Sequence, residues 1–193
     1  PKVLPLVFLA TAARDLGAAR VGLVAPYLGY MRQDRQFQPG EAVTSRAFAG
    51  LLSHYVDWLV TVDPHLHRYH SLGQIYTVPH RVVHAAPALA EWIRSQVDRP
   101  VLVGPDEESE QWVADVAERT GAPYLVVRKV RRGDRSVEVS LPDVDAHRHR
   151  TPVVVDDIVS SAQTMIAIVK HLLAAGLPAP VCVGVHALFS EHA

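Results

Sequence analysis

Only one of the 193 residues is a cysteine, Cys182. No internal disulfide can therefore form, and such low cysteine usage is typical of a reducing compartment. Long hydrophobic runs are also missing: the longest near the start, residues 3–13, is well short of the roughly 20 residues that a membrane span needs. This run lacks the charged and cleavage-site segments of a signal peptide. We expect a cytoplasmic protein with no membrane partner.

An excess of charge of either sign is absent as well. The 19 basic and 20 acidic residues give a formal net charge of −1, so nothing indicates a nucleic-acid partner. Apolar residues make up 49% of the chain and charged residues 20%, which is ordinary for a globular protein. A length of 193 residues allows one large domain or two small ones.

Strand-like and helix-like segments alternate along the whole chain. This rhythm predicts an α/β protein with a mostly parallel sheet and helices on both faces. Glycines are expected to end three of the helices, and Thr44 or Ser45 to cap another. The expected strands are residues 20–25, 58–62, 100–103, 124–128, 153–155 and 181–188, and the expected helices are residues 4–16, 44–54, 87–97, 109–120 and 165–173.

The stretch Val153–Thr164 combines several features of a ligand site. Three valines predict a buried strand, Asp156 and Asp157 stand at its carboxyl end, and a hydroxyl-rich loop, Ser160–Thr164, leads into a helix. Backbone N–H groups and the helix dipole would hold an anion there, and the paired acids suit a ribose diol or a hard cation. An ordinary strand end with a serine helix cap explains these residues equally well.

The loop Pro26–Glu41 is long and rich in side chains that bind nucleotides. It carries Arg32, Gln33 and Asp34 among several aromatic residues. Long loops inside compact domains are usually functional, and a guanidinium group can stack on a base and pair with phosphate. The alternative is a solvated polar loop that its aromatic residues anchor.

A second loop, Val62–His67, contains an acid and histidines after a predicted strand. Asp63, His65, His67 and His70 are potential zinc ligands. However, four ligands this close could converge only through an unusual turn, and Mg²⁺ held by few protein ligands and by phosphates is the better fit. The remaining histidines are then surface or structural residues.

Two further loops contain residues that could bind or neutralise phosphate. Arg128–Arg135 is a basic run, and a mobile basic loop would neutralise charge in phosphoryl transfer. The alternative is a solvated basic hairpin. Gly104–Ser109 contains Asp106 and acids that the first turn of a helix favours.

These motifs resemble one protein family. The residues VVVDDIVSSAQT resemble the signature of type I phosphoribosyltransferase folds, which cradles a 5-phosphate and ribose hydroxyls. The residues PYLGYMRQDRQFQPGE are similar to the ATP-binding loop of the ribose-phosphate diphosphokinases, also called PRPP synthetases. Val62–His67 resembles that family's Val-Asp-Leu-His segment, and Lys129 and Arg131 match the Lys-x-Arg of its catalytic flexible loop.

The resemblance implies a role for each matching residue. Lys129 and Arg131 would be catalytic, and Asp63 and His65 would lie at a Mg²⁺ site. ATP would be bound by Arg32, Gln33, Asp34 and His65. Ribose 5-phosphate would be bound by Asp106, Asp156, Asp157, Ser160, Ser161, Ala162, Gln163 and Thr164.

Three glycines of the family pattern are replaced by other residues. Glu108 and Ser109 replace two glycines that would let the backbone close on ribose phosphate, and Gln163 replaces another in the phosphate loop. If residue 163 needed a positive φ, glutamine there would cost roughly 1–2 kcal/mol.

The resemblance also implies the overall organisation. It implies two tandem phosphoribosyltransferase-like α/β domains, each a mostly parallel sheet flanked by helices. Residues 1–85 would be part of an ATP-binding domain and residues 86–193 a ribose 5-phosphate-binding domain. The family transfers the diphosphoryl group of ATP to ribose 5-phosphate with Mg²⁺ and assembles as homo-oligomers, so we expect a dimer or hexamer. We also expect further residues before Pro1 and after Ala193.

Two alternatives stay open at this point. One is a phosphoribosyltransferase that consumes PRPP, which the stretch Val153–Thr164 alone would allow. The other is a catalytically inactive regulatory relative, which the lost glycines at Glu108, Ser109 and Gln163 favour. The retained Lys129 and Arg131 argue against an inactive chain.

Overall fold

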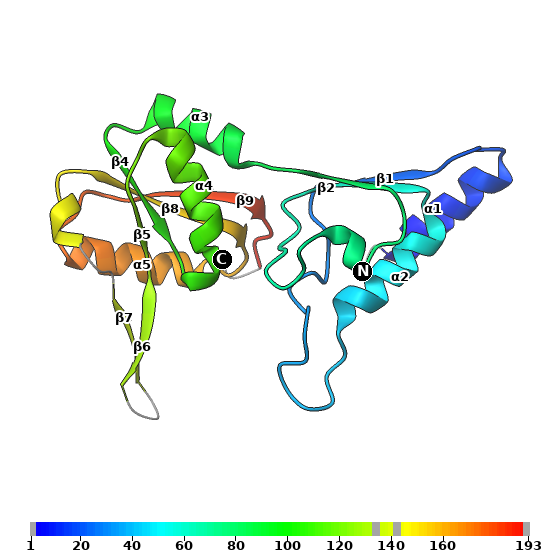
Figure 1. Cartoon of the computed structure of the whole chain (residues 1–193), viewed down its shortest axis with the longest axis horizontal. Coiled ribbons are helices and arrows are strands. Elements are labelled where there is room, and N and C mark those ends of the chain that lie inside the picture. Colours follow the sequence, from blue (N-terminus) through cyan, green and yellow to red (C-terminus); the bar gives the residue numbers. More distant parts are fainter. Residues whose placement is uncertain (1–2, 133–135, 141–143, 191–193) are drawn as a thin grey trace. The chain divides into compact units, whose positions relative to one another are not determined.

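A computed structural model describes residues 3–132, 136–140 and 144–190 of the chain, with the backbone alone for residues 129–132 and 136–140. The chain divides into two compact units, residues 1–84 (unit 1) and residues 85–193 (unit 2). Each unit has a parallel sheet of its own (Figure 1).

Unit 1 is built on a parallel sheet of three strands in the order β1-β2-β3. Helices α1 and α2 precede β1 and β2, and the short 3-10 helix η1 precedes β3 (Figure 1). The elements are α1 Val3–Asp15, β1 Gly22–Ala25, α2 Thr44–Tyr55, β2 Trp58–Val62, η1 Leu72–Gln74 and β3 His80–Val83.

The core of unit 1 lies on one face of its sheet. Strand β2 buries alternate residues, Leu59 and Thr61, as expected for a strand with one covered face. Leu59 shares a core cluster with Leu52 of α2 and with residues of the loops after β1 and β2. The outer strands carry exposed side chains, Val24 at 62% and Val83 at 42% exposure. The loops that follow β1 and β2 are thus anchored in the core.

Unit 2 is built on a parallel sheet of four strands in the order β5-β4-β8-β9, and a separate antiparallel hairpin, β6-β7, follows β5. The elements are α3 Ala86–Gln96, β4 Pro100–Gly104, η2 Glu107–Ser109, α4 Glu110–Thr120, β5 Tyr124–Val126, β6 Arg128–Arg132, β7 Ser136–Ser140, η3 Val144–His147, β8 Thr151–Val159, α5 Gln163–Ala174 and β9 Val181–Ala187.

Both faces of the unit 2 sheet are covered by helices. On one face, Leu102, Val153 and Val155 pack against α3 and α4. On the other face, Val103 and Val154 pack against α5. Because successive strand residues point to opposite faces, the continuous apolar runs of β4 and β8 supply both cores. The arrangement can be followed in Figure 1.

The predicted α/β class with mostly parallel sheets is confirmed. Strand β2 has the predicted bounds, and Gly17, Gly121 and Gly176 adopt positive φ at helix ends. No helix in the described part of the chain is both long enough and apolar enough to span a membrane.

Several local predictions were wrong. Val43, not Thr44 or Ser45, is the cap of α2, because the Ser45 hydroxyl is buried 3.1 Å from the Tyr69 hydroxyl. The strand predicted to end at Arg128 ends at Val126, and Arg128 begins the hairpin. Strand β8 does not stop before its acids but continues through them to Val159.

Gly22 is required by the close approach of an indole ring. It pairs with Trp58 across β1 and β2, and a Cβ at residue 22 would overlap the Trp58 ring. We expect Gly22→Ala to lower the free energy of unfolding by about 1–3 kcal/mol, because overpacking forces the ring or the strand to move. Urea denaturation followed by circular dichroism measures this.

The matched control is Gly50→Ala. Gly50 lies in α2, and an added methyl group would meet nothing within 4 Å apart from its chain neighbours and the backbone of its own helix. Alanine is the better helix former, so this variant should be more stable by about 0.5–1 kcal/mol. Equal stability of Gly22→Ala and the unmodified protein would contradict the packing argument.

Candidate functional site

The loop between β1 and α2 in unit 1 is organised by one carboxylate. Glu41 Oε2 accepts hydrogen bonds from the backbone N–H groups of Phe37 (3.0 Å) and Gln38 (3.1 Å) and from Gln33 Nε2 (3.2 Å). Of the predicted nucleotide-binding residues, Arg32 is exposed and Gln33 is half-buried. Glu41 was not predicted to have this role.

Asp34 joins this loop to the loop after β2. Its carboxylate has no exposed surface, and Arg68 Nη1 lies 3.0 and 3.1 Å from its two oxygens. The next residue, Tyr69, directs its hydroxyl at the Asp34 carbonyl oxygen (3.4 Å) and at the Ser45 hydroxyl (3.1 Å). A buried carboxylate needs such partners, because desolvation penalises an unpaired charge. Asp34 therefore fixes two loops to one another.

Two guanidinium groups lie over the ring of Phe37, one from its own loop and one from the loop after β2. The guanidinium carbons of Arg35 and Arg68 lie 4.9 and 5.9 Å from the centre of its ring. Both distances are within the range of cation–π attraction. The exposed end of the loop thus presents an aromatic ring with positive charge beside it.

The loop after β2 has an unusual backbone. Asp63 and His65 have positive φ values of 34° and 57°, and the His65 N–H donates to the Asp63 carbonyl oxygen at 2.9 Å. A positive φ strains the backbone of any residue other than glycine, and such strained residues are common at functional sites. The Asp63 carboxylate lies 3.0 Å from His84 Nδ1, and His65 Nδ1 lies 3.1 Å from His67 Nε2. Each predicted metal-site residue therefore has a histidine partner.

In unit 2, three acids gather at one edge of the sheet. Strands β4 and β8 are adjacent and parallel, so Asp106 after β4 and Asp156 in β8 come to the same edge. Burial raises the pKa of Asp156 to about 7, and the charges of Asp157 and Asp106 act in the same direction. This edge therefore favours a bound cation or a hydrogen-bond donor beside Asp156.

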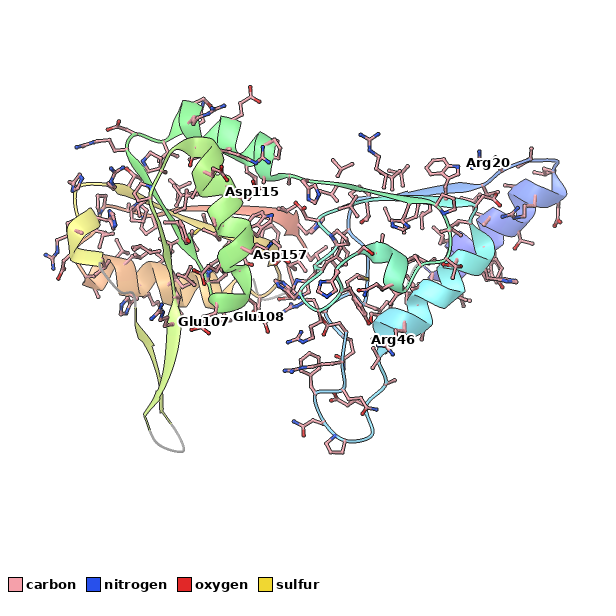
Figure 2. All side chains as sticks on the ribbon, viewed as in Figure 1. Arg20, Arg46, Glu107, Glu108, Asp115 and Asp157 are labelled. Carbon is pink, nitrogen blue, oxygen red and sulfur yellow. The ribbon has the colours of Figure 1, made fainter. Side chains whose placement is uncertain are left out.

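Asp106 is also part of a capping box at the start of η2, the short 3-10 helix that leads into α4. Its carboxylate accepts a hydrogen bond from the Ser109 N–H (3.0 Å), and the Ser109 hydroxyl donates to the Asp106 carbonyl oxygen (2.6 Å). Glu107 and Glu108 stand beside it at this end of α4 (Figure 2). Serine at residue 109 thus closes the loop on itself. This is one of the two positions in the loop at which serine or glutamate replaces a glycine of the ribose-phosphate diphosphokinase pattern.

The predicted phosphate loop leads directly into α5. Ser160 is half-buried and Ser161 is exposed, and Gln163 begins the helix. The positive φ falls on Ala162 (57°), not on Gln163, so the strain considered for glutamine is absent there. The N–H groups of the first turn of a helix have no partner within the helix and can receive an anion.

The predicted catalytic residues Lys129 and Arg131 lie in β6, where they pair with Val139 and Val137 of β7. Their backbone therefore forms the hairpin that the basic run also allowed. Their side chains lie outside the described part of the structure.

Parallel sheets with acids and a helix N-terminus at the strand ends define a phosphoribosyltransferase-like α/β protein. Residues 71–193 match the family described as "Phosphoribosyl transferase domain", and residues 2–55 match "N-terminal domain of ribose phosphate pyrophosphokinase". The chain therefore belongs to the phosphoribosyl transferase domain family, and its first residues are similar to the N-terminal domain of ribose phosphate pyrophosphokinase.

Individual relatives agree with this assignment. A ribose-phosphate pyrophosphokinase of Methanopyrus kandleri is 35% identical over 184 residues, which are 94% of this chain and 62% of that protein. One of Methanothermobacter thermautotrophicus is 36% identical over 165 residues, 85% of this chain and 56% of that protein. The chain thus spans about three fifths of the length of these curated relatives.

A solved structure shows the same fold. The crystal structure of phosphoribosylpyrophosphate synthetase from Mycobacterium smegmatis superposes with a TM-score of 0.80. It is 23% identical and matches 94% of this chain and 60% of that chain.

The contacts that sequence reasoning missed join residues far apart in the chain. Arg68 and Asp34 are 34 residues apart, and His84 and Asp63 are 21 apart. No spacing rule connects such residues before the strands are placed. For Glu41, the position directly after Pro-Gly was the only available signal.

The Asp34–Arg68 pair yields a prediction about stability. We expect Arg68→Gln to lower the free energy of unfolding by about 3–5 kcal/mol, because it leaves a buried carboxylate unpaired. Asp34→Asn should cost less, about 1–3 kcal/mol, because Arg68 is partly exposed and can be hydrated. Urea denaturation gives both values.

Asp115→Asn is the matched control. Asp115 pairs with Arg119 at 2.8 Å on α4, but both side chains are at least 40% exposed. Exposed helical pairs contribute less than about 0.5 kcal/mol. A loss in Asp115→Asn as large as that in Arg68→Gln would refute the distinction between the two pairs.

Asp156 yields a prediction about pH. Its native pKa of about 7 lies above the ordinary value of 3.8, so the native state keeps a proton that the unfolded state releases. Stability from this group is present below pH 4 and is lost as the pH rises towards 7. Asp156→Asn should therefore melt above the unmodified protein at pH 8, and this difference should vanish near pH 4.

Thermal melting between pH 4 and 8, without ligand, measures the effect. Asp145→Asn, which changes an exposed carboxylate on η3, should follow the pH profile of the unmodified protein. Parallel profiles for Asp156→Asn and the unmodified protein would show that Asp156 titrates normally.

Proposed function

We propose that the protein transfers the diphosphoryl group of ATP to the 1-hydroxyl of ribose 5-phosphate and forms PRPP and AMP. In this reaction the hydroxyl oxygen attacks the β-phosphorus, the bond from that phosphorus to the α,β-bridging oxygen breaks, and the hydroxyl proton is lost. The observation that carries the proposal is the acid edge followed by the N-terminus of α5, in a chain whose first residues match the pyrophosphokinase N-terminal domain.

Unit 1, residues 1–84, is the proposed nucleotide-binding part, and the sequence predicted this domain over residues 1–85. Arg32 is exposed in the loop after β1 and offers a guanidinium group for ATP, and Gln33 follows it. Asp34 has a different role from direct binding. Because its carboxylate is fully buried against Arg68, we assign it the positioning of the loop that carries Arg32.

Unit 2, residues 85–193, is the proposed ribose 5-phosphate-binding part, and the sequence predicted this domain over residues 86–193. Asp156 and Asp157 would accept hydrogen bonds from the ribose hydroxyls. A hydroxyl donor suits Asp156 in particular, because its neighbourhood disfavours an isolated charge. Residues Ser160–Thr164 would hold the 5-phosphate through the first N–H groups of α5 and the hydroxyls of the loop. Asp106 borders this edge.

Mg²⁺ is the proposed cofactor, and the carboxylates of the chain fit it. Mg²⁺ takes oxygen ligands and binds through one or two carboxylates together with phosphates. Asp63 in unit 1 and the Asp156–Asp157 pair in unit 2 provide such oxygens. When bound, the ion would neutralise phosphate charge and orient the reacting groups. His65 suits this ion less well, because imidazole is a softer ligand.

Lys129 and Arg131 are the proposed catalytic cations. Transfer of a phosphoryl-type group depends on positioning and on charge neutralisation rather than on covalent chemistry. Two cations on the β6–β7 hairpin would provide that neutralisation at the transferring group. We further propose a cytoplasmic homo-oligomer, in line with the family resemblance and the single cysteine.

An inactive regulatory relative is the second candidate. The capping box of Asp106 and Ser109 favours it, because the loop that would close on ribose phosphate already bonds to itself. Glu107 and Glu108 at the same helix end would repel a phosphate that approached them.

Release of AMP tests the proposal. The full natural protein, given ATP, ribose 5-phosphate and Mg²⁺, should form AMP and PRPP in equal amounts. Lys129→Ala should lower kcat by roughly 10²-fold or more, because a charge that stabilises the transition state is lost. The control is Lys170→Ala, which changes an exposed lysine of α5 and should leave kcat within twofold.

Three results separate the candidates. AMP formation that Lys129→Ala abolishes and Lys170→Ala preserves supports the diphosphokinase. No turnover, together with retained binding of ATP or ribose 5-phosphate by calorimetry, favours the regulatory relative. Formation of a nucleotide from PRPP and a base would replace both proposals.

A further inference from the structure

The side chain of Gln33 is held by two acceptors on its own loop. Its Nε2 atom lies 3.2 Å from Glu41 Oε2 and 3.4 Å from the backbone carbonyl oxygen of Arg35. A carboxylate oxygen and a carbonyl oxygen only accept hydrogen bonds, so the amide nitrogen of Gln33 must face them. Both N–H groups of this amide are thus used inside the loop.

The backbone of Gln33 is held as well. Its N–H donates to the Tyr30 carbonyl oxygen at 3.1 Å, and its carbonyl oxygen accepts a hydrogen bond from the Ser45 N–H at 3.2 Å, in the first turn of α2. Among the residues that the structure describes, none donates to the side-chain oxygen Oε1. The half-buried Gln33 therefore has one polar atom left for a ligand, and that atom is an acceptor.

Glu41 fixes this orientation of the amide. The same Oε2 atom also accepts hydrogen bonds from the backbone N–H groups of Phe37 (3.0 Å) and Gln38 (3.1 Å). Three donors thus locate one oxygen, and hydrogen bonds to a charged acceptor are about twice as strong as neutral ones. Without the carboxylate, the amide of Gln33 could turn and present its N–H groups to a ligand instead of its oxygen.

An acceptor selects the part of a nucleotide that it can contact. Phosphate oxygens are themselves acceptors, so Oε1 of Gln33 gains nothing from a triphosphate. The nucleoside part of ATP supplies donors, which are the two ribose hydroxyls and the 6-amino group of adenine. Gln33 therefore suits the nucleoside, whereas the guanidinium group of the neighbouring, exposed Arg32 suits the phosphates.

We propose that Glu41 is a positioning residue that orients the amide of Gln33, and that Gln33 Oε1 accepts a hydrogen bond from an O–H or N–H group of the nucleoside. This inference rests on the proposed function, because it takes the loop Pro26–Glu41 as the ATP-binding loop. It deepens that function by making Gln33 a residue that discriminates between nucleotides. A site built around such a hydrogen bond rejects an analogue that lacks the donor.

Binding of ATP analogues tests the proposal. Calorimetry with the full natural protein and Mg²⁺ gives the Kd of ATP, 2′-deoxyATP, 3′-deoxyATP and ITP, whose base has an oxygen in place of the 6-amino group. The analogue without the donor for Gln33 should bind about three- to tenfold more weakly than ATP, as expected for one lost hydrogen bond. The identity of that analogue shows whether Gln33 contacts the base or the ribose.

Variants of Gln33 and Glu41 separate orientation from damage to the loop. Gln33→Ala should bind ATP about as weakly as the disfavoured analogue and should no longer discriminate between the two. Glu41→Ala should also lose this discrimination, whereas Glu41→Gln, which keeps an acceptor oxygen, should retain it. If Glu41→Ala does not fold, Glu41→Asp replaces it, because its carboxylate is drawn back by one methylene group. A loop that is merely destabilised would weaken all four nucleotides equally and leave their ratios unchanged.

Gln36→Ala is the matched control, because Gln36 is an exposed glutamine of the same loop. Its four Kd values should stay within twofold of those of the unmodified protein. Equal binding of all four nucleotides by the unmodified protein would overturn the proposal, as would discrimination that survives in Gln33→Ala, or a complete lack of nucleotide binding. The ratios do not depend on AMP formation. A chain that discriminates without forming AMP keeps this inference and loses the proposed function, and a chain that forms AMP without discriminating does the reverse.

Discussion

The parallel pairing of β4 with β8 determines where the polar groups of unit 2 lie. The two strands share one register, from Pro100 beside Thr151 to Val103 beside Val154, and both end at the same edge of the sheet. Asp106, which follows β4, therefore comes to the acids of β8. The mutual effect on the pKa of Asp156 depends on this alignment. The apolar runs that drive the pairing are buried on both faces, so packing secures the geometry of the edge.

In unit 1, the polar groups are held in position by loops rather than by the ends of paired strands. Its small sheet has a core on one face, and the long loop after β1 contributes Leu28 and Met31 to that core. The polar residues of the same loop are held by Glu41 and by the buried Asp34–Arg68 pair. Apolar anchors set the position of the loop, and charge pairs set its detailed shape. An exposed residue such as Arg32 can then stand on a backbone with little freedom.

Most of the fold could be predicted from hydrophobic periodicity and from the residues that end helices. In strand β2, every residue except Leu59 is β-branched or aromatic, which favours a strand. The glycines at 17, 121 and 176 mark helix ends because each adopts a positive φ. Strand β3 was missed, since its four residues, His80–Val83, are too few for an alternating pattern. The prediction of Ser45 as a helix cap was wrong because a serine hydroxyl that can cap a helix can equally form a hydrogen bond with a distant tyrosine. Such choices depend on tertiary contacts.

The candidate site was predictable only in part, for the same reason. Motifs located Asp63, Asp106 and Asp156, because each follows or ends a strand run. The pairing of Asp63 with His84, the pairing of Asp34 with Arg68, and the raised pKa of Asp156 could be seen only in the folded chain. The positive φ at Ala162 instead of Gln163 shows the limit of motif matching, because a shift of one residue moves the strained position.

The capping box of Asp106 and Ser109 has a consequence for the entropy of binding. Glycines at such a position leave a loop free to adopt many conformations, and a ligand must then order it. Here the side chains bond the loop to its own backbone before any ligand arrives. The loop therefore has less conformational entropy to lose when a ligand binds. Association at this loop should resemble docking to a rigid surface rather than binding that orders a flexible loop.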